Sequence, residues 1–257
     1  MKHPSWQSFL VAWMLGLALT TAAPAQAQPA ADSLSVADPS TSFSARQLII
    51  PAALITVGGF GVSNGWLEHV NHGVKNRMAR LRSDHHMPAD SYLRFLPAAA
   101  NVALSATGLP ARHSLRQRLL LTATATAAMA VMAEGAKRTV HERRPDNSDR
   151  RSFPSGHAAT AFMGAELVRS DYGTGVGIAA YSVATLVAAM RLYNERHWLN
   201  DVLAGAGIGI LSARMAYWLL PLEQRLLGWD DQSAAAAVVP TYEPQTQSLG
   251  FSVALAF

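Results

Sequence analysis

The chain has 257 residues, of which half are apolar and 15% are charged, with a formal net charge of +4 and no cysteine. The lack of cysteine excludes disulfides, thiolate nucleophiles and zinc–thiolate sites. The charged share is below the usual value of about 25%, which indicates a membrane or a helix-rich interior. The mean hydropathy of +0.12 is nevertheless low for a chain that lies mostly within a bilayer. The basic balance favours anionic partners such as phosphate esters or acidic lipid surfaces.

The N-terminus has the features of an export signal. A short basic start precedes the apolar run Phe9–Ala23, and Ala25-Gln26-Ala27 provides a small-x-small cleavage pattern. We predict a signal peptide over residues 1–27, with an uncleaved anchor helix as the alternative. Residues 28–46 are rich in Pro, Ser, Ala and Asp, which predicts a linker.

Apolar, helix-biased segments follow the linker. They cover Gln47–Trp66, Phe95–Ala111, Leu119–Ala133, His157–Val168, Tyr172–Met190 and Val202–Leu220. Only the first, second and fifth approach the length of about 17–25 residues that a spanning helix needs. Pro221 is expected to end the last segment, in which Gly205, Gly207 and Gly209 favour close helix contact. We predict an all-α fold over residues 47–228, a membrane-embedded bundle of about six core helices; tight packing in a soluble bundle is the alternative.

Two regions beside these helices are polar or strand-like. The basic stretch Asn64–Leu93 is typical of a solvated amphipathic helix and loop, or of a surface lying on anionic headgroups. It contains His85-His86, which has no carboxylate at ligand spacing, so we assign no metal there. In the tail, residues 229–257, the segments Ala236–Thr241 and Leu249–Phe257 predict a small strand pair packed on the helices.

The first of three polar clusters is the basic segment from Lys137 to Arg151. If the preceding helix continued, Lys137 and Arg144 would share a face, but Pro145 disfavours helix at Arg144, so the chain should turn there. A lysine point charge and an arginine fork together suit a phosphate dianion. Taken alone, such a segment is more often a charged helix end followed by a solvated loop.

The second cluster, Pro154-Ser155-Gly156-His157, opens an apolar helix. Ser155 is suited to cap the helix, and Gly156 lets the backbone approach a ligand closely. The free N–H groups and the helix dipole favour an anion at this end, with His157 beside it. A capped helix start by itself does not explain a histidine directly after the glycine.

The third cluster runs from Arg191 to Asp201. His197 and Asp201 are four residues apart and are therefore neighbours on one helical face. A carboxylate that accepts from Nδ1–H fixes the tautomer and leaves Nε2 as a nucleophile or base. Arg191 adds a third cation. An isolated histidine–aspartate pair at this spacing is usually a surface contact.

Together the three clusters describe a site for one tetrahedral oxyanion. Three cations and the backbone N–H groups would match the charge on the equatorial oxygens of a phosphoryl group. One histidine would attack and the other would protonate the leaving alkoxide, without a metal. The ordered motifs K-x6-RP, PSGH and R-x5-H-x3-D resemble those of the type 2 phosphatidic acid phosphatase (PAP2) and vanadium haloperoxidase superfamily. The resemblance extends from about Arg112 to Leu220 and is greatest to bacterial exported lipid phosphatases.

The resemblance implies a metal-independent enzyme, without a cofactor, that hydrolyses a lipid phosphate monoester through a phosphohistidine. Substrates of that branch are of the phosphatidic acid, phosphatidylglycerol phosphate, lipid A or undecaprenyl pyrophosphate type. The residues implied for phosphate binding are Lys137, Arg144, Ser155, Gly156 and Arg191. Those implied for catalysis are His157 as general acid, His197 as nucleophile and Asp201, which orients His197. Met190 stands where the family often has serine, which removes a hydroxyl contact but no charged group.

We therefore expect a lipid phosphate substrate and a place in a bacterial inner membrane, with the active site facing the periplasm. A soluble periplasmic acid phosphatase and a vanadate-dependent haloperoxidase are the alternative enzymes. An anion- or lipid-binding protein with an inactive site is the non-enzyme alternative. Nucleic acid is not an expected partner, because the basic residues gather around two histidines rather than along an aromatic-lined groove. The sequence makes no prediction of oligomeric state.

Overall fold

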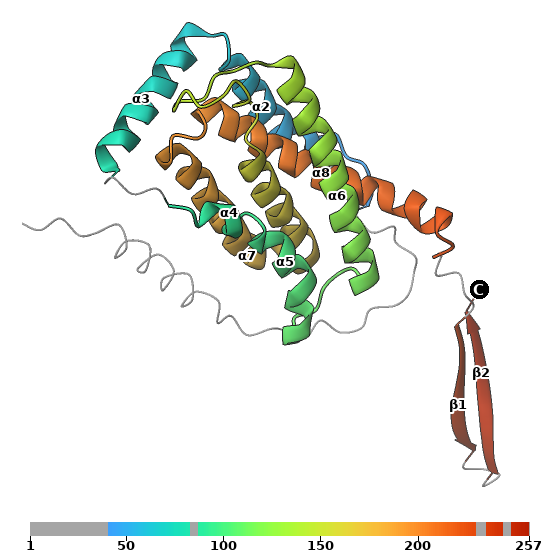
Figure 1. The fold of residues 1–257 in the computed structure, drawn as a ribbon. Coiled ribbons are helices and arrows are strands. Elements are labelled where there is room, and N and C mark those ends of the chain that lie inside the picture. The colour runs from blue at the N-terminus through green and yellow to red at the C-terminus, as the bar shows by residue number, and fades with distance from the viewer. Residues whose placement is uncertain (1–40, 83–86, 230–234, 244–247, 257) are drawn as a thin grey trace, which may run out of the picture. The chain divides into compact units, whose positions relative to one another are not determined.

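The computed structural model describes residues 41–82, 87–229, 235–243 and 248–256 (Figure 1). Its helices are α2 (Arg46–Phe60), α3 (Gly65–Leu81), α4 (Asp90–Leu93), α5 (Leu96–Ala103), the 3-10 helix η1 (Leu104–Thr107), α6 (Leu115–Thr139), α7 (Gly156–Tyr193) and α8 (Leu199–Leu226). These helices form a bundle, so the predicted all-α fold is confirmed. The predicted signal peptide, residues 28–40 of the linker and His85-His86 lie outside the described residues.

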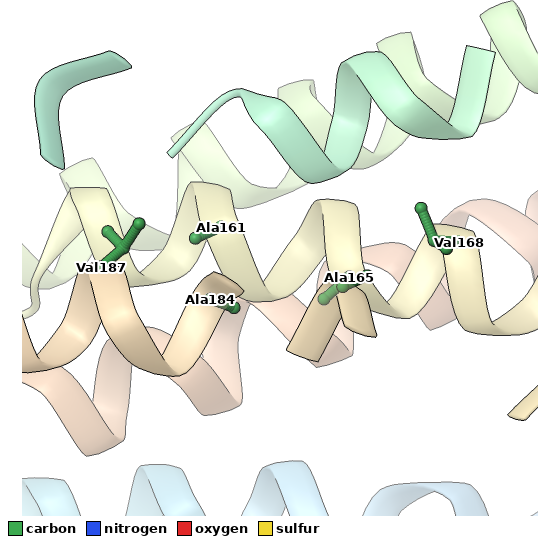
Figure 2. Packing of buried hydrophobic residues seen from close by; sticks show 6 residues of the cluster. Ala161, Ala165, Val168, Ala184 and Val187 are labelled. Carbon is green, nitrogen blue, oxygen red and sulfur yellow. The ribbon is translucent and has the colours of Figure 1, made fainter. Parts of the chain in front are cut away.

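The longest helix, α7, reverses direction at Gly173. This residue has φ 83° and ψ 178°, a conformation that is essentially restricted to glycine. Tyr181 Oη donates to Glu166 Oε2 at 2.6 Å across 15 residues of chain, which would span roughly 22 Å in a straight helix. The two halves therefore pack against each other (Figure 2). Their shared apolar cluster contains Ala161, Ala165, Val168, Ala180, Ala184 and Val187.

Glycines on α8 allow it to pack closely on two neighbouring helices. A Cβ at Gly205 would overlap the carbonyl oxygen of Ser155, and Gly209 faces another carbonyl of α7. A Cβ at Gly207 would lie 2.7 Å from the carbonyl oxygen of Pro51 in α2. The predicted close helix contacts are thus confirmed. The contact between Gly205 and Ser155 also sets the start of α7 beside the start of α8.

Three helices in the described part of the chain are long and apolar enough to cross a membrane: α6, α7 and α8. The number is four if α2 and α3, which are bent by 92° relative to each other, form one broken span. By length and composition these are the helices of a membrane protein. Because α7 reverses at Gly173, its two halves would cross as an antiparallel pair.

The prediction of which segments have spanning length was partly wrong. Residues 95–111 are not one helix, because α5 ends at Ala103, η1 follows, and Gly108 takes a left-handed φ of 87°. Residues 119–133 are instead the middle of the longer helix α6. The Ser114 hydroxyl caps this helix and forms a capping box with Gln117, so polar residues at both ends extend it beyond the apolar run.

Two further helix ends differ from the prediction. Residues 47–66 are not one straight helix, because α2 ends at Phe60 and the Asn64 side chain caps α3. Pro221 does not end α8 but lies inside it. A proline removes one backbone hydrogen bond, and α8 continues past it only for the last turn, to Leu226.

The tail contains two strands, β1 (Ala235–Glu243) and β2 (Ser248–Ala256). They pair antiparallel in a register that joins Ala235 to Ala256 and Glu243 to Ser248. This strand pair belongs to a unit that clusters separately from residues 1–218. Its packing on the helices stays a prediction.

Candidate active site

The second and third clusters meet where α7 and α8 begin. Ser155 caps α7, because its Oγ accepts from Ala158 N at 3.4 Å. Its backbone N–H donates to the carbonyl oxygen of Asp201 at 3.0 Å, which joins the start of α7 to the first turn of α8. Gly156 is the first residue of α7, so its free N–H group lies at this junction.

His197 and Asp201 form the predicted pair, although His197 precedes α8 instead of lying within it. His197 Nδ1 is 3.4 Å from Asp201 Oδ2, and the two residues are only 4% and 0% exposed. The same oxygen accepts from Ser152 Oγ at 2.5 Å and from Trp198 N at 2.8 Å. The Ser152 hydroxyl and the Trp198 N–H group thus hold the Asp201 carboxylate in place. The ring nitrogen Nε2 of His197 faces away from this carboxylate.

His157 lies in the first turn of α7 and contacts an arginine from outside the three clusters. Nη1 of Arg94, between α4 and α5, is 3.4 Å from His157 Nδ1. An arginine only donates, so Nδ1 acts as the acceptor in this contact and the ring proton of a neutral His157 resides on Nε2. A neutral imidazole is a poor acid, so a proton donor at this position would be the imidazolium form of His157.

Lys137 occupies the last turn of α6, which ends at Thr139. Lys137 and Arg144 therefore do not share a helix face. The Lys137 ammonium instead donates to the carbonyl oxygens of Pro154 at 2.7 Å and Arg151 at 3.1 Å. An ammonium has three N–H donors, so these two bonds leave one for an anion beside the PSGH segment.

The two arginines of the motifs are held by carboxylates. Arg144 Nε donates to Asp149 Oδ1 at 2.8 Å, and its Nη1 to the carbonyl of Arg196 at 3.4 Å. Arg191 Nη1 donates to Asp90 Oδ2 at 2.5 Å, in a pair that is 7% and 2% exposed. Arg191 Nε is buried without a hydrogen-bond partner among the described residues. Each guanidinium thus keeps donors that an incoming oxyanion would satisfy.

The electrostatic interactions show that these groups lie near one another. Burial lowers the pKa of His197 from its usual 6.5, Asp201 opposes that shift, and the charges of Arg191 and Arg144 lower the pKa further. His157 interacts electrostatically with Arg191 and His197, and the Lys137 charge interacts with those of Arg144 and Asp201. The structure therefore brings the predicted site residues together.

Several polar neighbours of the site were not identified from the sequence: Asp90, Arg94, Glu142, Ser152 and Asn200. In the sequence, Glu142 lies between Lys137 and Arg144, and Asn200 directly precedes Asp201. Their positions next to motif residues could therefore have identified them as neighbours of the site. Asp90 is 101 residues from Arg191 in the sequence and Arg94 is 63 residues from His157, and no spacing in the sequence marks either residue.

The site carries donors for an anion and not ligands for a cation. Among the described residues, no group of three or more histidine or carboxylate side chains is arranged to hold a metal ion. His197 lines a small pocket with Asn71 and Lys75 of α3 and with Pro145. A phosphoryl group is matched by the charge and donors of this region.

Comparison with known proteins agrees with the motif analysis. The PAP2 superfamily model matches residues 118–225. The predicted resemblance to this superfamily is thereby confirmed. The lipid A 1-phosphatase of Porphyromonas gingivalis is 34% identical over 141 residues, which cover 53% of this chain and 32% of that protein. The chain thus aligns with about a third of the length of this relative.

Two solved structures resemble the fold at low sequence identity. The transmembrane PAP2 type phosphatidylglycerolphosphate phosphatase from Bacillus subtilis has 18% identity and a TM-score of 0.49, over 69% of this chain and 97% of that one. Aquifex aeolicus LpxE has 19% identity and a TM-score of 0.41, over 58% of this chain and 92% of that one.

Proposed function

We propose that this protein is a metal-independent phosphatase that hydrolyses a lipid phosphate monoester through a phosphohistidine. The observation that carries the proposal is the convergence of His157 and His197 with three motif cations on one buried, carboxylate-anchored site. The PAP2 match over residues 118–225 and the named activity of the P. gingivalis relative support the same reaction class. The apolar helices favour a substrate that resides in a membrane.

The proposed reaction has two steps. His197 Nε2 attacks phosphorus, the bond to the alcohol oxygen breaks, and the imidazolium form of His157 donates its Nε2 proton to the leaving alkoxide and becomes neutral. Lys137, Arg144 and Arg191, with the Ser155 hydroxyl and the Gly156 N–H group, bind the phosphoryl oxygens as negative charge builds on them. Water then attacks the phosphohistidine and breaks the P–N bond. His157 takes the proton of that water and is restored.

Phosphate release from the protein in detergent tests this proposal. The protein is incubated with phosphatidic acid, phosphatidylglycerol phosphate, lipid A and undecaprenyl pyrophosphate, with a metal chelator present. We expect release from at least one lipid, and an acid-labile phosphoenzyme in the parent that is missing in His197→Gln. Activity that appears only after a divalent metal is added would contradict the proposal.

The alternative functions predict different outcomes of simple assays. A vanadate-dependent haloperoxidase would oxidise halide after vanadate is added, and a soluble acid phosphatase would be extracted by salt without detergent. We expect neither result, because α6, α7 and α8 have the length and composition of spanning helices. An inactive anion-binding protein would bind phosphate but release none from any ester.

We propose that the protein resides in a bacterial inner membrane with its site facing the periplasm. The site and the Gly173 turn lie at opposite ends of the first half of α7, and the chain contains no cysteine. Single cysteines at the exposed positions Ser148 and Thr174 would therefore report the two ends. An impermeant maleimide on intact spheroplasts should label Ser148→Cys and spare Thr174→Cys; the reverse pattern would overturn the orientation.

A further inference from the structure

Two carboxyl groups face each other behind the proposed nucleophile. Glu142, in the loop after α6, lies beside the first turn of α8, because its carboxyl oxygens are 3.1 Å from Nδ2 of Asn200, and its carboxyl group interacts electrostatically with that of Asp201. Two neighbouring buried carboxylates repel, so one of the pair retains a proton. The proposed mechanism gives Glu142 no role, although it is the immediate neighbour of the residue that orients His197.

The surrounding donors decide which carboxyl holds the proton. Asp201 Oδ2 accepts from the Ser152 hydroxyl and from Trp198 N–H, and it faces His197 Nδ1. Glu142 has the Asn200 amide, whose Nδ2 lies 3.1 Å from both of its carboxyl oxygens. Donors stabilise an ionised carboxylate, so Asp201 is the ionised partner and Glu142 is the neutral acid. Burial, followed by the charge of Asp201, raises the pKa of Glu142 to about 9.

One oxygen of Asp201 is left for this contact. Asp201 Oδ1 is buried, and no donor among the described residues reaches it. A buried oxygen without a donor is costly, and the O–H group of a protonated Glu142 is the donor that would satisfy it. Backbone bonding keeps Glu142 in place, because its carbonyl oxygen accepts from Ser152 N at 3.0 Å.

The amide that supports Glu142 is itself fixed by α3. Asn71 Nδ2 donates to Asn200 Oδ1 at 2.9 Å, and Asn200 N donates to Asn71 Oδ1 at 3.3 Å. This reciprocal pair holds the Asn200 side chain so that its Nδ2 faces Glu142. A chain of contacts thus runs from α3 through Asn200 and Glu142 to Asp201.

We propose that Glu142 is a positioning residue: a neutral carboxylic acid that donates to Asp201 Oδ1 and thereby holds the carboxylate that orients His197. This inference rests on the proposed function of the site. The proposed role depends on the proton of the Glu142 carboxyl group and not only on the volume of its side chain. Among the described residues, the titratable side chains of His197 and Lys137 interact electrostatically with Asp201.

Three variants separate this role from simple packing. Glu142→Gln keeps the shape and an N–H donor but cannot ionise, whereas Glu142→Ala removes the donor. We expect Glu142→Gln to stay within about threefold of the parent kcat, and Glu142→Ala to lose roughly tenfold or more with little change in KM, as for one hydrogen bond to a charged group. Glu68→Gln, on the exposed surface of α3, is the matched control and should behave as the parent. Equal losses in Glu142→Gln and Glu142→Ala would overturn the proposal.

Infrared spectroscopy detects the protonation state of Glu142 directly and does not depend on catalytic activity. The difference spectrum between the parent and Glu142→Gln at pH 7 should contain the C=O band of one protonated carboxyl group, which fades as the pH is raised through about 9. A carboxylate band in place of the acid band would overturn the proposal. If the parent releases no phosphate from any ester, the proposed function fails, whereas the infrared result still decides the state of Glu142.

Discussion

Two buried histidine–aspartate pairs lie at opposite ends of the first half of α7. At the site end, His197 Nδ1 is 3.4 Å from Asp201; near the Gly173 turn, His113 Nδ1 is 2.6 Å from Asp171 Oδ1. All four residues are buried. Of the two contacts, the one near the turn is a hydrogen bond, whereas His197 Nδ1 is buried without a hydrogen-bond partner among the described residues. A short histidine–carboxylate contact therefore does not by itself identify a catalytic pair.

The two pairs differ in the hydrogen-bond and ion-pair partners of the cations that surround them. Near the turn, Arg118 donates to the carbonyls of Asn101 and Val102 and to two hydroxyl groups. Glu166 there is bound by Arg169, Tyr181 and Arg214. The hydrogen bonds and ion pairs of Glu166 hold the two halves of α7 against each other and against α8.

At the site end the cations keep donors that have no partner among the described residues. Lys137 has only backbone carbonyls as hydrogen-bond partners among the described residues, and Arg191 Nε has none. In the proposed function, the phosphoryl group of the substrate would accept from these donors. Near the turn, Arg118 Nε also lacks a partner among the described residues, so the site end is distinguished by several motif cations and two histidines that lie together and not by an unpartnered donor alone.

The sharpest test of the comparison replaces each histidine by glutamine. His197→Gln should lower kcat on the order of 10³-fold or more, because the nucleophile is lost. His113→Gln should leave the turnover of folded protein nearly unchanged and lower the free energy of unfolding by about 1–3 kcal/mol. Phosphate release and thermal unfolding in detergent measure both effects. Comparable phosphate release by His197→Gln and the parent would break the comparison.

His157→Ala sharpens the assignment of the proton donor. Loss of general acid catalysis typically costs on the order of 10²–10⁴-fold, and least for a leaving group that needs no proton. We expect a much larger loss for an alkyl phosphate than for p-nitrophenyl phosphate. Steady-state kcat/KM values for the two esters check this, and equal losses would argue against the role.

The pH profile tests whether Asp201 acts on His197. In the proposed mechanism neutral His197 is the nucleophile, and burial lowers the pKa of His197 below 6.5. Activity should therefore persist through pH 6.5 and fall only as the pH decreases through the lowered pKa. Asp201 raises this pKa, so Asp201→Asn should move the acid limb to still lower pH and reduce the plateau on the order of 10²-fold or more. An acid limb that moves upward in kcat/KM profiles would contradict this arrangement.

The smallest expected effect concerns the turn that separates the two ends. Gly173→Ala should destabilise the protein by about 1–3 kcal/mol, because φ 83° with ψ 178° is strained for alanine. Gly175→Ala, two residues on and with open space around a new Cβ, is the control and should be neutral or slightly stabilising. Thermal unfolding of both variants decides this, and equal stabilities would argue against the strained turn.

Local spacing was sufficient to predict much of the site. The motifs predicted the Ser155 cap, the His197–Asp201 pair and the turn before Pro145, because each depends on residues within one or two turns of chain. Spacing failed where contacts are long-range: Asp90 and Arg94 reach Arg191 and His157 from a distant segment. It also failed for α6, because the polar residues at both ends of this helix lie outside the apolar run from which its length was predicted.

The sequence by itself determined the helical composition, the small-residue helix contacts and the order of the charged motifs, because these follow from local propensity and periodicity. Only the tertiary structure decided that α7 folds back at Gly173 and that Arg94 meets His157. It also decided that Glu142 faces Asp201. Such contacts depend on how helix surfaces fit together, and no local pattern in the chain encodes that fit.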